Sequence, residues 1–272
     1  SVQDANNCIS TIPVNVTEPA ILNASTVTVP ANCYAFADGS ASLSVTGGTT
    51  PYAYLWSNGN TTAAPTGLAA GNYSVVITDA HNCTFTSSVT ITQPAAINIT
   101  VSSDSVNCAG GNDGSLIATA AGGAGSFSYS WSSGSHSALA SSLSAGSYTV
   151  TVTDAHNCTS TRTDFVFEPL PVALLTSSTS TLCFGSADGT ATVNASGGHA
   201  PYHYVWTPSG QLNPTATNLA AGNYSVTVSD NLGCTSSVSV AVANAVVLNA
   251  NTTTYNISCN GGTDGHATVA VT

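Results

Sequence analysis

The sequence predicts an all-β chain of tandem β-sandwich domains, each of about 75 residues. The first observation is a stretch at Leu68–Cys83, LAAGNYSVVITDAHNC, that returns as LSAGSYTVTVTDAHNC at Leu143–Cys158 and as LAAGNYSVTVSDNLGC at Leu219–Cys234. The second is the alternation of apolar and polar residues along short runs between turn signals, which is the period of a strand. The third is composition, because Ser, Thr, Asn, Gly and Ala dominate while the helix-favouring Lys, Arg, Glu and Met are scarce or absent.

The repeat period divides the chain into parts with short joins. We expect the C-terminal strands of a preceding repeat at 1–20, whole repeats at 21–94, 95–169 and 170–244, and the N-terminal strands of a following repeat at 245–272. Pro stops a strand from running on, and it marks the joins at Glu18-Pro19, Gln93-Pro94 and Glu168-Pro169, whereas the join at Ala243-Asn244 departs from this pattern. Since no long flexible linker separates the repeats, we expect a stiff, rod-like array.

Within the first repeat the pattern predicts seven short strands, which describes a two-sheet sandwich. The expected elements are a strand at 21–29, one carrying Ala41, Leu43 and Val45, one at 52–56, a weak strand after Asn58-Gly59, a short run into Leu68, a strand ending at Asp79, and a last strand carrying Val89 and Ile91.

The aromatic residues of these strands are predicted to form the core. Tyr54 and Trp56 share one strand face, and in the second repeat Ser128 and Ser130 occupy the opposite, wet face. Tyr73 shares a face with Val75 and Ile77. The core residues expected at equivalent positions are Trp56, Trp131, Trp206, Tyr73, Tyr148 and Tyr224.

Charge and motif content exclude several functions. Arg162 is the one basic residue against twelve acidic ones, which disfavours nucleic acid and anionic membrane surfaces as partners. No apolar run is long enough for a membrane span and no signal segment opens the chain. With no Met and a start inside a repeat, we expect a processed piece of a longer secreted polypeptide. No Gly-x-Ser-x-Gly elbow, phosphate loop or zinc-spaced Cys pair occurs, and Leu232 replaces the turn residues His81 and His156. We therefore expect no catalytic residue and no cofactor apart from calcium.

Acidic residues recur at two turn positions, one with Asp38, Asp113, Asp188 and Asp264 and the other with Asp4, Asp79, Asp154 and Asp230. One interpretation is that each Asp bonds the backbone of its own turn. The other is calcium bound between repeats by carboxylate and carbonyl oxygens. The candidate calcium ligands are Asp38, Asp113, Asp154 and Asp230.

Several spaced motifs together resemble a known repeat. Leu68-x-x-Gly71-x-Tyr73 resembles the tyrosine corner of immunoglobulin-like domains, and Trp56 lies where such domains keep a Trp. The whole set resembles the SprB-type repeat of Bacteroidota surface adhesins, a relative of PKD and immunoglobulin-like modules: Cys33, Asp38-Gly39, Gly47-Gly48, Pro51-Tyr52-x-Tyr54-x-Trp56, Leu68-x-x-Gly71-x-Tyr73 and Asp79-x-x-x-Cys83. The resemblance implies a long secreted or cell-surface adhesin, exported by type IX secretion and used in gliding or biofilm.

Carbohydrate could enter in two ways. Asp104-Ser105-Val106 resembles the O-glycosylation signal of Bacteroidota, which makes Ser105 a candidate site, and Asn23, Asn60 and Asn98 begin Asn-x-Ser/Thr triplets. Sugar binding by exposed aromatic residues is disfavoured, because the repeated Tyr and Trp residues fall on the inward face.

The sequence thus favours a structural repeat array that forms a fibre or stalk on a bacterial cell, with neighbouring repeats as its partners. The alternative is a self-polymerising filament subunit, in which 245–272 of one chain is completed by strand exchange with 1–20 of an identical chain. An array of carbohydrate-binding modules, with surface glycans as partners, is the less favoured third hypothesis.

The eight cysteines fall at two repeat positions, and a secreted chain is expected to oxidise them. Pairing within a repeat would join Cys33–Cys83, Cys108–Cys158 and Cys183–Cys234. However, these two turns are expected at opposite ends of a sandwich over ~20 Å tall, whereas a disulfide tolerates at most about 7 Å between Cα atoms. We therefore favour links across the joins, Cys33–Cys158 and Cys108–Cys234, and keep the within-repeat set as the alternative.

Overall fold

The computed structural model describes residues 1–272 and contains strands but no helix. The contacts divide the chain into two compact units. Unit 1 consists of Ser1–Thr100, Ala118–Ala138 and Val150–Arg162, and unit 2 of Val101–Ile117, Leu139–Thr149 and Thr163–Thr272. Residues of the second repeat therefore contribute to both units.

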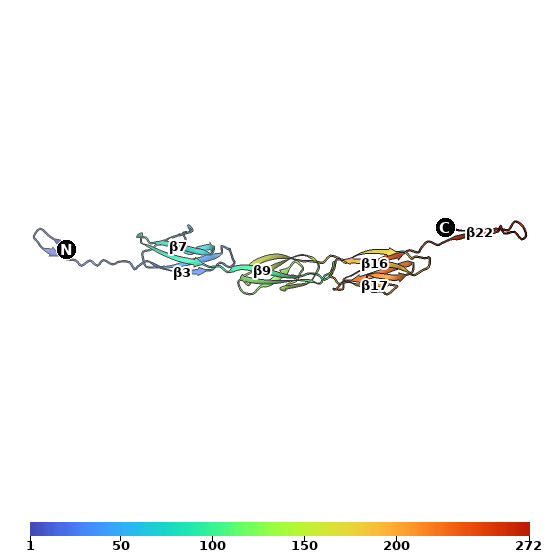
Figure 1. Ribbon diagram of the computed structural model, residues 1–272. Helices are drawn as coiled ribbons and strands as arrows, with labels where there is room; N and C mark the ends of the chain where they lie inside the picture. The colour runs from blue at the N-terminus through green and yellow to red at the C-terminus, as the bar shows by residue number, and fades with distance from the viewer. The chain divides into compact units, whose positions relative to one another are not determined.

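In unit 1 the first repeat is a sandwich of two three-stranded antiparallel sheets (Figure 1). One sheet has the order β3-β4-β6 and the other β5-β7-β8. The strands are β3 (Asn23–Val29), β4 (Gly39–Thr46), β5 (Ala53–Trp56), β6 (Thr66–Leu68), β7 (Gly71–Thr78) and β8 (Thr84–Ile91). Three strands in each sheet, with the chain crossing between sheets after β4, β5 and β6, give the immunoglobulin-like order that the sequence predicted.

The same order recurs twice. The second repeat has sheets β9-β10-β12 and β11-β13-β14, and the third has β15-β16-β18 and β17-β19-β20. The strands of the second repeat are β9 (Ala95–Asp104), β10 (Gly114–Gly123), β11 (Ser128–Trp131), β12 (Leu139–Leu143), β13 (Gly146–Thr153) and β14 (Thr159–Val166). Those of the third are β15 (Ala173–Thr179), β16 (Gly189–Ser196), β17 (His203–Thr207), β18 (Thr215–Leu219), β19 (Gly222–Ser229) and β20 (Thr235–Val242).

The prediction of seven strands is wrong by one. The weak strand expected after Asn58-Gly59 is absent, because local bonds hold this segment in turns. Asn60 Oδ1 accepts the backbone N–H of Thr62 at 2.8 Å, and Thr62 O accepts the indole N–H of Trp56 at 2.9 Å. Side-chain bonds of this kind offer the backbone an alternative to a sheet ladder.

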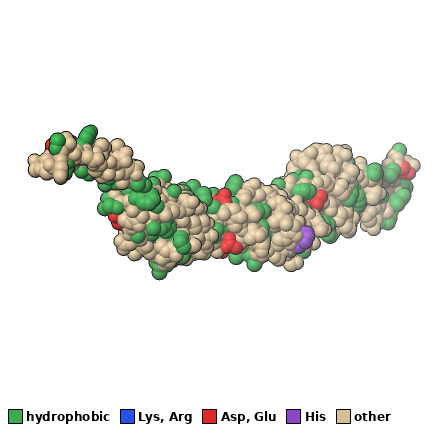
Figure 2. All heavy atoms as spheres, turned by 90° about the vertical axis from the view of Figure 1, so that its right-hand side faces the viewer, with side chains coloured by type: hydrophobic (Ala, Val, Ile, Leu, Met, Phe, Trp, Pro, Cys, Tyr) green, Lys and Arg blue, Asp and Glu red, His purple; other side chains and the backbone are tan.

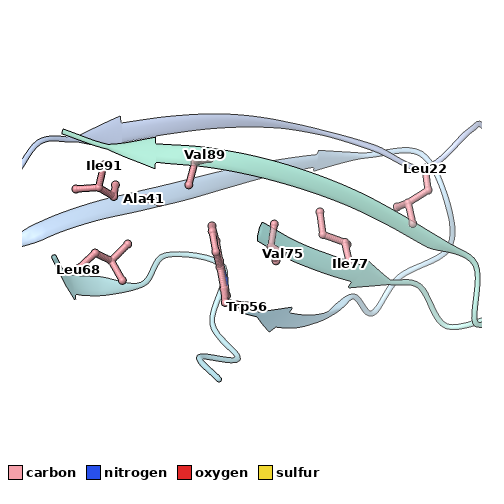
Figure 3. Close-up of a cluster of buried hydrophobic side chains, with 8 residues drawn as sticks. All are labelled: Leu22, Ala41, Trp56, Leu68, Val75, Ile77, Val89 and Ile91. Atoms are coloured by element: carbon pink, nitrogen blue, oxygen red, sulfur yellow. The ribbon is translucent and has the colours of Figure 1, made fainter. Parts of the chain in front are cut away.

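The core lies between the two sheets, as Figure 3 shows for the first repeat. Trp56, Val75 and Ile77 are at most 2 % exposed and point toward the opposite sheet. The predicted faces are confirmed, since Asn72 and Ser74 are exposed on β7. Burying a large apolar side chain stabilises the fold by ~1.5–3 kcal/mol. Each repeat thus depends on one Trp, and Trp131 and Trp206 are 3 % and 0 % exposed.

The tyrosine corner is present in all three repeats. The hydroxyl group of Tyr73 donates to Ala69 O at 3.0 Å. Tyr148 and Tyr224 make the equivalent bonds to Ser144 O and Ala220 O, also at 3.0 Å. These half-buried side chains close the turn that precedes β7, β13 and β19.

Gly39 shows why Asp is followed by Gly in each repeat. The sequence suggested an Asp-Gly turn, but Gly39 is the first residue of β4 and is buried. A Cβ atom there would lie 2.6 Å from Ile91 Cγ2 and 2.9 Å from Leu68 O. Close packing of three strands, and not a turn conformation, therefore requires this glycine.

Each unit also ends in a two-stranded hairpin. In unit 1 β1 (Val2–Gln3) pairs with β2 (Ile9–Ser10), and in unit 2 β21 (Ala250–Tyr255) pairs with β22 (His266–Val271). All side chains of these four strands are exposed.

On the face shown in Figure 2 the acidic side chains form separate red spots among neutral polar atoms.

Candidate functional site: the junctions between repeats

A disulfide links consecutive repeats within each unit. In unit 1 Cys33, in the turn between β3 and β4, is bonded to Cys158, in the turn between β13 and β14, with Cα atoms 5.7 Å apart. In unit 2 Cys108 is bonded to Cys234 with Cα atoms 5.5 Å apart. These are the two links that the sequence analysis favoured across the joins. The within-repeat alternative would bond Cys83 to Cys33 and Cys183 to Cys234. Both Cys83 and Cys183 are free and exposed.

Strand register explains why the link crosses the join. The turn that holds Cys33 lies beside the end of β8, because the N–H of Ala31 donates to Thr92 O at 2.9 Å. The turn that holds Cys83 lies at the other end of β8, where Thr84 pairs with Thr78. A strand of eight residues separates the two ends by about 25 Å, far beyond the reach of a disulfide.

An aspartate holds the cysteine of the second turn in place. Asp154 Oδ1 accepts the backbone N–H groups of His156 and Cys158, each at 2.9 Å. Its Oδ2 accepts the N–H of Ala124, in the turn between β10 and β11, at 2.8 Å. One carboxylate therefore joins two turns and orients Cys158 toward the neighbouring repeat. Asp79 and Asp230 accept the equivalent three N–H groups at 2.8–3.0 Å.

The Gly-Gly pair that follows the second strand makes room for this carboxylate. Gly123 has a φ of +56°, and a Cβ atom there would lie 2.8 Å from Asp154 Oδ2. Gly48 and Gly198 repeat the arrangement against Asp79 and Asp230. Backbone with φ in this range favours glycine, so the pair is required by both conformation and space.

The same bonds keep these carboxylates ionised. The N–H of Cys83 is the largest influence on Asp79 and lowers the pKa of its carboxyl group, with further lowering by Thr49 and His81. At Asp154 and Asp230 burial is the largest single influence and raises the pKa. The backbone N–H donors together outweigh it, so the pKa of both groups is lowered.

The first turn is held by a residue that the sequence analysis did not single out. Gln93, two residues after the end of β8, accepts the N–H of Ala35 with its side-chain oxygen at 2.8 Å. Glu168 accepts from Gly110 at 2.7 Å, and Asn244 from Gly185 at 3.1 Å. The join at Ala243-Asn244 thus keeps the same hydrogen bond. The signal was a polar residue before Pro at three joins, which we attributed to the Pro.

The two junctions differ in one pair of contacts. In unit 1 the side-chain amide of Asn32 donates to His156 O at 3.1 Å, and His156 Nδ1 lies 3.3 Å from Asn32 O. In unit 2 Leu232 stands in place of the histidine, and the side chain of Asn107 bonds Asp113 of its own turn. The unit 1 junction therefore has reciprocal polar contacts beside its disulfide.

The recurring Asp of the first turn also bonds its own backbone. Asp38 and Asp113 accept the N–H groups of Asn32 and Asn107 at 2.9 and 3.0 Å. Asp38 and Asp154 line the same cleft beside the Cys33–Cys158 disulfide. No group of three His, Cys, Asp or Glu side chains that could hold a metal ion is present. The hydrogen bonds of these carboxylates described above all come from backbone N–H groups or polar side chains of turns. Calcium binding between repeats stays the alternative interpretation of these carboxylates.

The glycosylation candidates differ in exposure. Ser105, Asn23 and Asn98 are exposed, and Asn60 is half-buried with its Oδ1 in the turn described above.

No helix in the structure could span a membrane. Immunoglobulin-like adhesion and repeat domains are not typically enzymatic.

Comparison with known proteins identifies the repeat. A family model described as SprB repeat matches the chain three times, at residues 25–61, 100–136 and 175–211. The SprB repeat model thus matches one segment of each of the three sandwiches. Each match begins in the first strand of a sandwich and ends just after the Trp strand. The resemblance drawn from the spaced motifs is thereby confirmed. SprB repeats belong to cell-surface proteins, and disulfides are consistent with an extracellular location.

Solved structures similar to this chain contain tandem immunoglobulin domains. The eight N-terminal Ig domains of Down Syndrome Cell Adhesion Molecule isoform 1.30.30 align at 10% identity with a TM-score of 0.33, covering 90% of this chain and 38% of that one. Dpr2 Ig1-Ig2 in complex with DIP-Theta Ig1-Ig3 aligns at 10% identity with a TM-score of 0.29, covering 80% of this chain and 96% of that one. No curated protein matches the sequence.

Proposed function

We propose that this chain is a structural repeat array of a secreted or cell-surface bacterial adhesin, forming part of a fibre or stalk used in adhesion, gliding or biofilm. Its partners in this role are neighbouring repeats of the same kind. The SprB repeats and the immunoglobulin-like fold fit a cell-surface adhesin-type array. The single observation that supports a stalk under tension is the disulfide that links each whole repeat to the next.

The physical reason lies in how such a link responds to tension. A noncovalent join between repeats can open when the ends of an array are pulled. A disulfide across the join keeps the two repeats attached even when the hydrogen bonds around it break. The carboxylate of Asp154 accepts the backbone N–H of Cys158 at 2.9 Å and so holds one end of that covalent link in place.

The test is cellular. Antibodies against residues 21–244 would be used for immunogold labelling of intact source cells, and cells with and without the encoding gene would be compared for surface attachment and gliding. We expect label on fibres outside the cell and a loss of attachment or gliding without the gene. Label confined to the cell interior, or unchanged attachment and motility, would contradict the proposal.

A further inference from the structure

A cleft lies beside the Cys33–Cys158 disulfide in unit 1, with a volume of about 410 Å³. Tyr34 and Phe36, from the turn between β3 and β4, line it and are 53% and 59% exposed. Asn32, His156 and Asn157 line it too. A volume of roughly 300–1,000 Å³ is usual for sites that hold small molecules.

The two aromatic rings stand on a restrained turn. Cys33 ties one end of the turn to the next repeat, the N–H of Phe36 donates to Cys33 O at 3.2 Å, and the N–H of Ala35 donates to the side chain of Gln93 at 2.8 Å. A turn whose backbone is already restrained loses little conformational entropy when a ligand binds beside it.

Ala35 adds strain to this turn. Its φ is +60°, whereas the equivalent positions in the next two repeats hold Gly110 and Gly185 at +74° and +79°. A residue with a side chain in this region is uncommon, and such strain is concentrated at functional sites. The first repeat therefore keeps a costlier residue between its two aromatic rings.

The polar lining gives the cleft its chemistry. Asn and His side chains beside exposed aromatic faces can exchange hydrogen bonds with hydroxyl groups while the rings cover the apolar face of a sugar ring. No Lys or Arg lines the cleft, and the carboxylates of Asp38 and Asp154 do. An anionic sugar would therefore be repelled, and a neutral one would not.

We propose that this cleft is a binding site for a neutral saccharide, one or two pyranose rings of which stack on Tyr34 and Phe36. The proposal deepens the cell-surface role proposed above, and it rests on that role only for access to an external glycan. It also revises the argument made from the sequence, in which sugar binding was disfavoured because the repeated Tyr and Trp residues point inward. Tyr34 and Phe36 are not at those repeated positions.

The second junction supplies an internal comparison. Its cleft, in unit 2, has a similar volume of about 430 Å³, but Ala109 and Gly111 stand where unit 1 has Tyr34 and Phe36. Pro169, Leu170 and Pro171 line it where Pro94, Ala95 and Ala96 line the cleft of unit 1. The two clefts thus differ in aromatic content and not in size, so the proposal assigns binding to unit 1 alone.

The test uses the whole chain with its disulfides oxidised. Binding of cellohexaose, laminarihexaose, mannohexaose and chitohexaose would be measured by NMR titration, with sialyllactose as an anionic probe. We expect at least one neutral probe to bind and sialyllactose not to bind. Tyr34→Ala and Phe36→Ala should each weaken binding by about tenfold, or ~1.4 kcal/mol. Tyr34→Phe should retain binding, because it keeps the ring.

Phe184→Ala is the matched control. Phe184 follows Cys183 as Tyr34 follows Cys33, and it is 62% exposed. Cys183, however, is free and forms no disulfide with another turn. Binding should be unchanged in this variant. Absence of binding by all four neutral probes, binding that survives loss of both rings, or preference for sialyllactose would overturn the proposal. Any of these results would leave the immunogold test of the surface role unaffected, so the two failures are distinguishable.

Discussion

Asp154 accepts the backbone N–H of Cys158 at 2.9 Å, four residues along the chain. This short bond connects the architecture of one repeat to the covalent link with another, because Cys158 is the residue bonded to Cys33. The same relationship holds between Asp230 and Cys234 at 2.9 Å in unit 2. The recurring Asp therefore acts as a positioning residue for the junction.

Replacing Asp154 with Ala should destabilise the second repeat. Three backbone N–H groups, those of Ala124, His156 and Cys158, would lose their acceptor in a site that is 5% exposed. We expect the thermal midpoint to fall by about 5 °C or more, measured by circular dichroism. Glu18→Gln, at an exposed position in the first 20 residues, is the control and should leave the midpoint unchanged. Equal midpoints for Asp154→Ala and the control would mean that the carboxylate does not organise the turns.

Replacing Trp131 with Ala should cost about 3–5 kcal/mol of unfolding free energy in its repeat, because a large side chain leaves a cavity. Trp131 is 3% exposed and its indole N–H donates to Ser137 O at 3.1 Å. Urea unfolding followed by circular dichroism measures the change. Val205→Ala, on a strand face with 49% exposure, should cost about 0.5 kcal/mol or less. If the Trp131→Ala variant and the unsubstituted chain unfolded at the same urea concentration, this Trp would not be part of the core.

Acid should destabilise the folded chain, because the pKa values of five of its carboxyl groups are lowered by folding. The pKa values of Asp79, Asp154, Asp188, Asp230 and Asp264 are lowered. The unfolded chain therefore binds more protons than the folded chain between the folded and the ordinary pKa, which is near 4. Their stabilisation is fully present above about pH 4 and is lost as the pH falls through the lowered values. Thermal midpoints measured from pH 7 to pH 2 should be level down to about pH 4 and then decline. A midpoint that rises on acidification would contradict this assignment.

Pulling the chain by its ends should reveal the disulfides directly. Each one closes a loop of 125 or 126 residues. A variant with Cys108→Ser and Cys234→Ser retains one link, and in single-molecule force spectroscopy its full extension should be about 400 Å shorter when oxidised than when reduced, at ~3.5 Å per residue.

The matched control for the pulling experiment is Cys83→Ser with Cys183→Ser, which removes two free thiols and should not alter extension in either redox state. Equal extension of the oxidised and reduced single-link variant would show that Cys33 and Cys158 are not bonded.

Calcium should have little effect on stability. Ca²⁺ takes about six to eight oxygen ligands, whereas each carboxylate of Asp154 and Asp230 already accepts three backbone N–H groups. Adding about 2 mM Ca²⁺ or an equal amount of EDTA should move the thermal midpoint by less than about 1 °C, since only a bound ligand stabilises the folded state. Asp38→Asn provides the comparison at the other turn. A rise of several degrees with Ca²⁺ that Asp38→Asn abolishes would instead establish a calcium site.

Local pattern was enough to predict most of the sandwich. Period-2 alternation placed Tyr73, Val75 and Ile77 on the inner face, because side chains of a strand alternate between core and water whatever lies further away. The repeat spacing predicted where Trp131 and Trp206 would be buried. The prediction of an extra strand after Asn58-Gly59 was wrong because hydrogen bonds of Thr62 with Trp56 and Asn60 hold this segment in turns. Such individual contacts do not appear as a periodic pattern in the sequence.

The sequence by itself determined the all-β fold, the repeat and the two turns that carry cysteine, since each depends on residues close together in the chain. Only the tertiary structure decided which surfaces those turns share. The bond of Gln93 to Ala35, the carboxylate of Asp154 between two turns, and the cleft between Phe36 and His156 join residues 30 to more than 100 positions apart. Such contacts depend on how whole sheets stack and how one sandwich meets the next, which local alternation of apolar and polar residues does not encode.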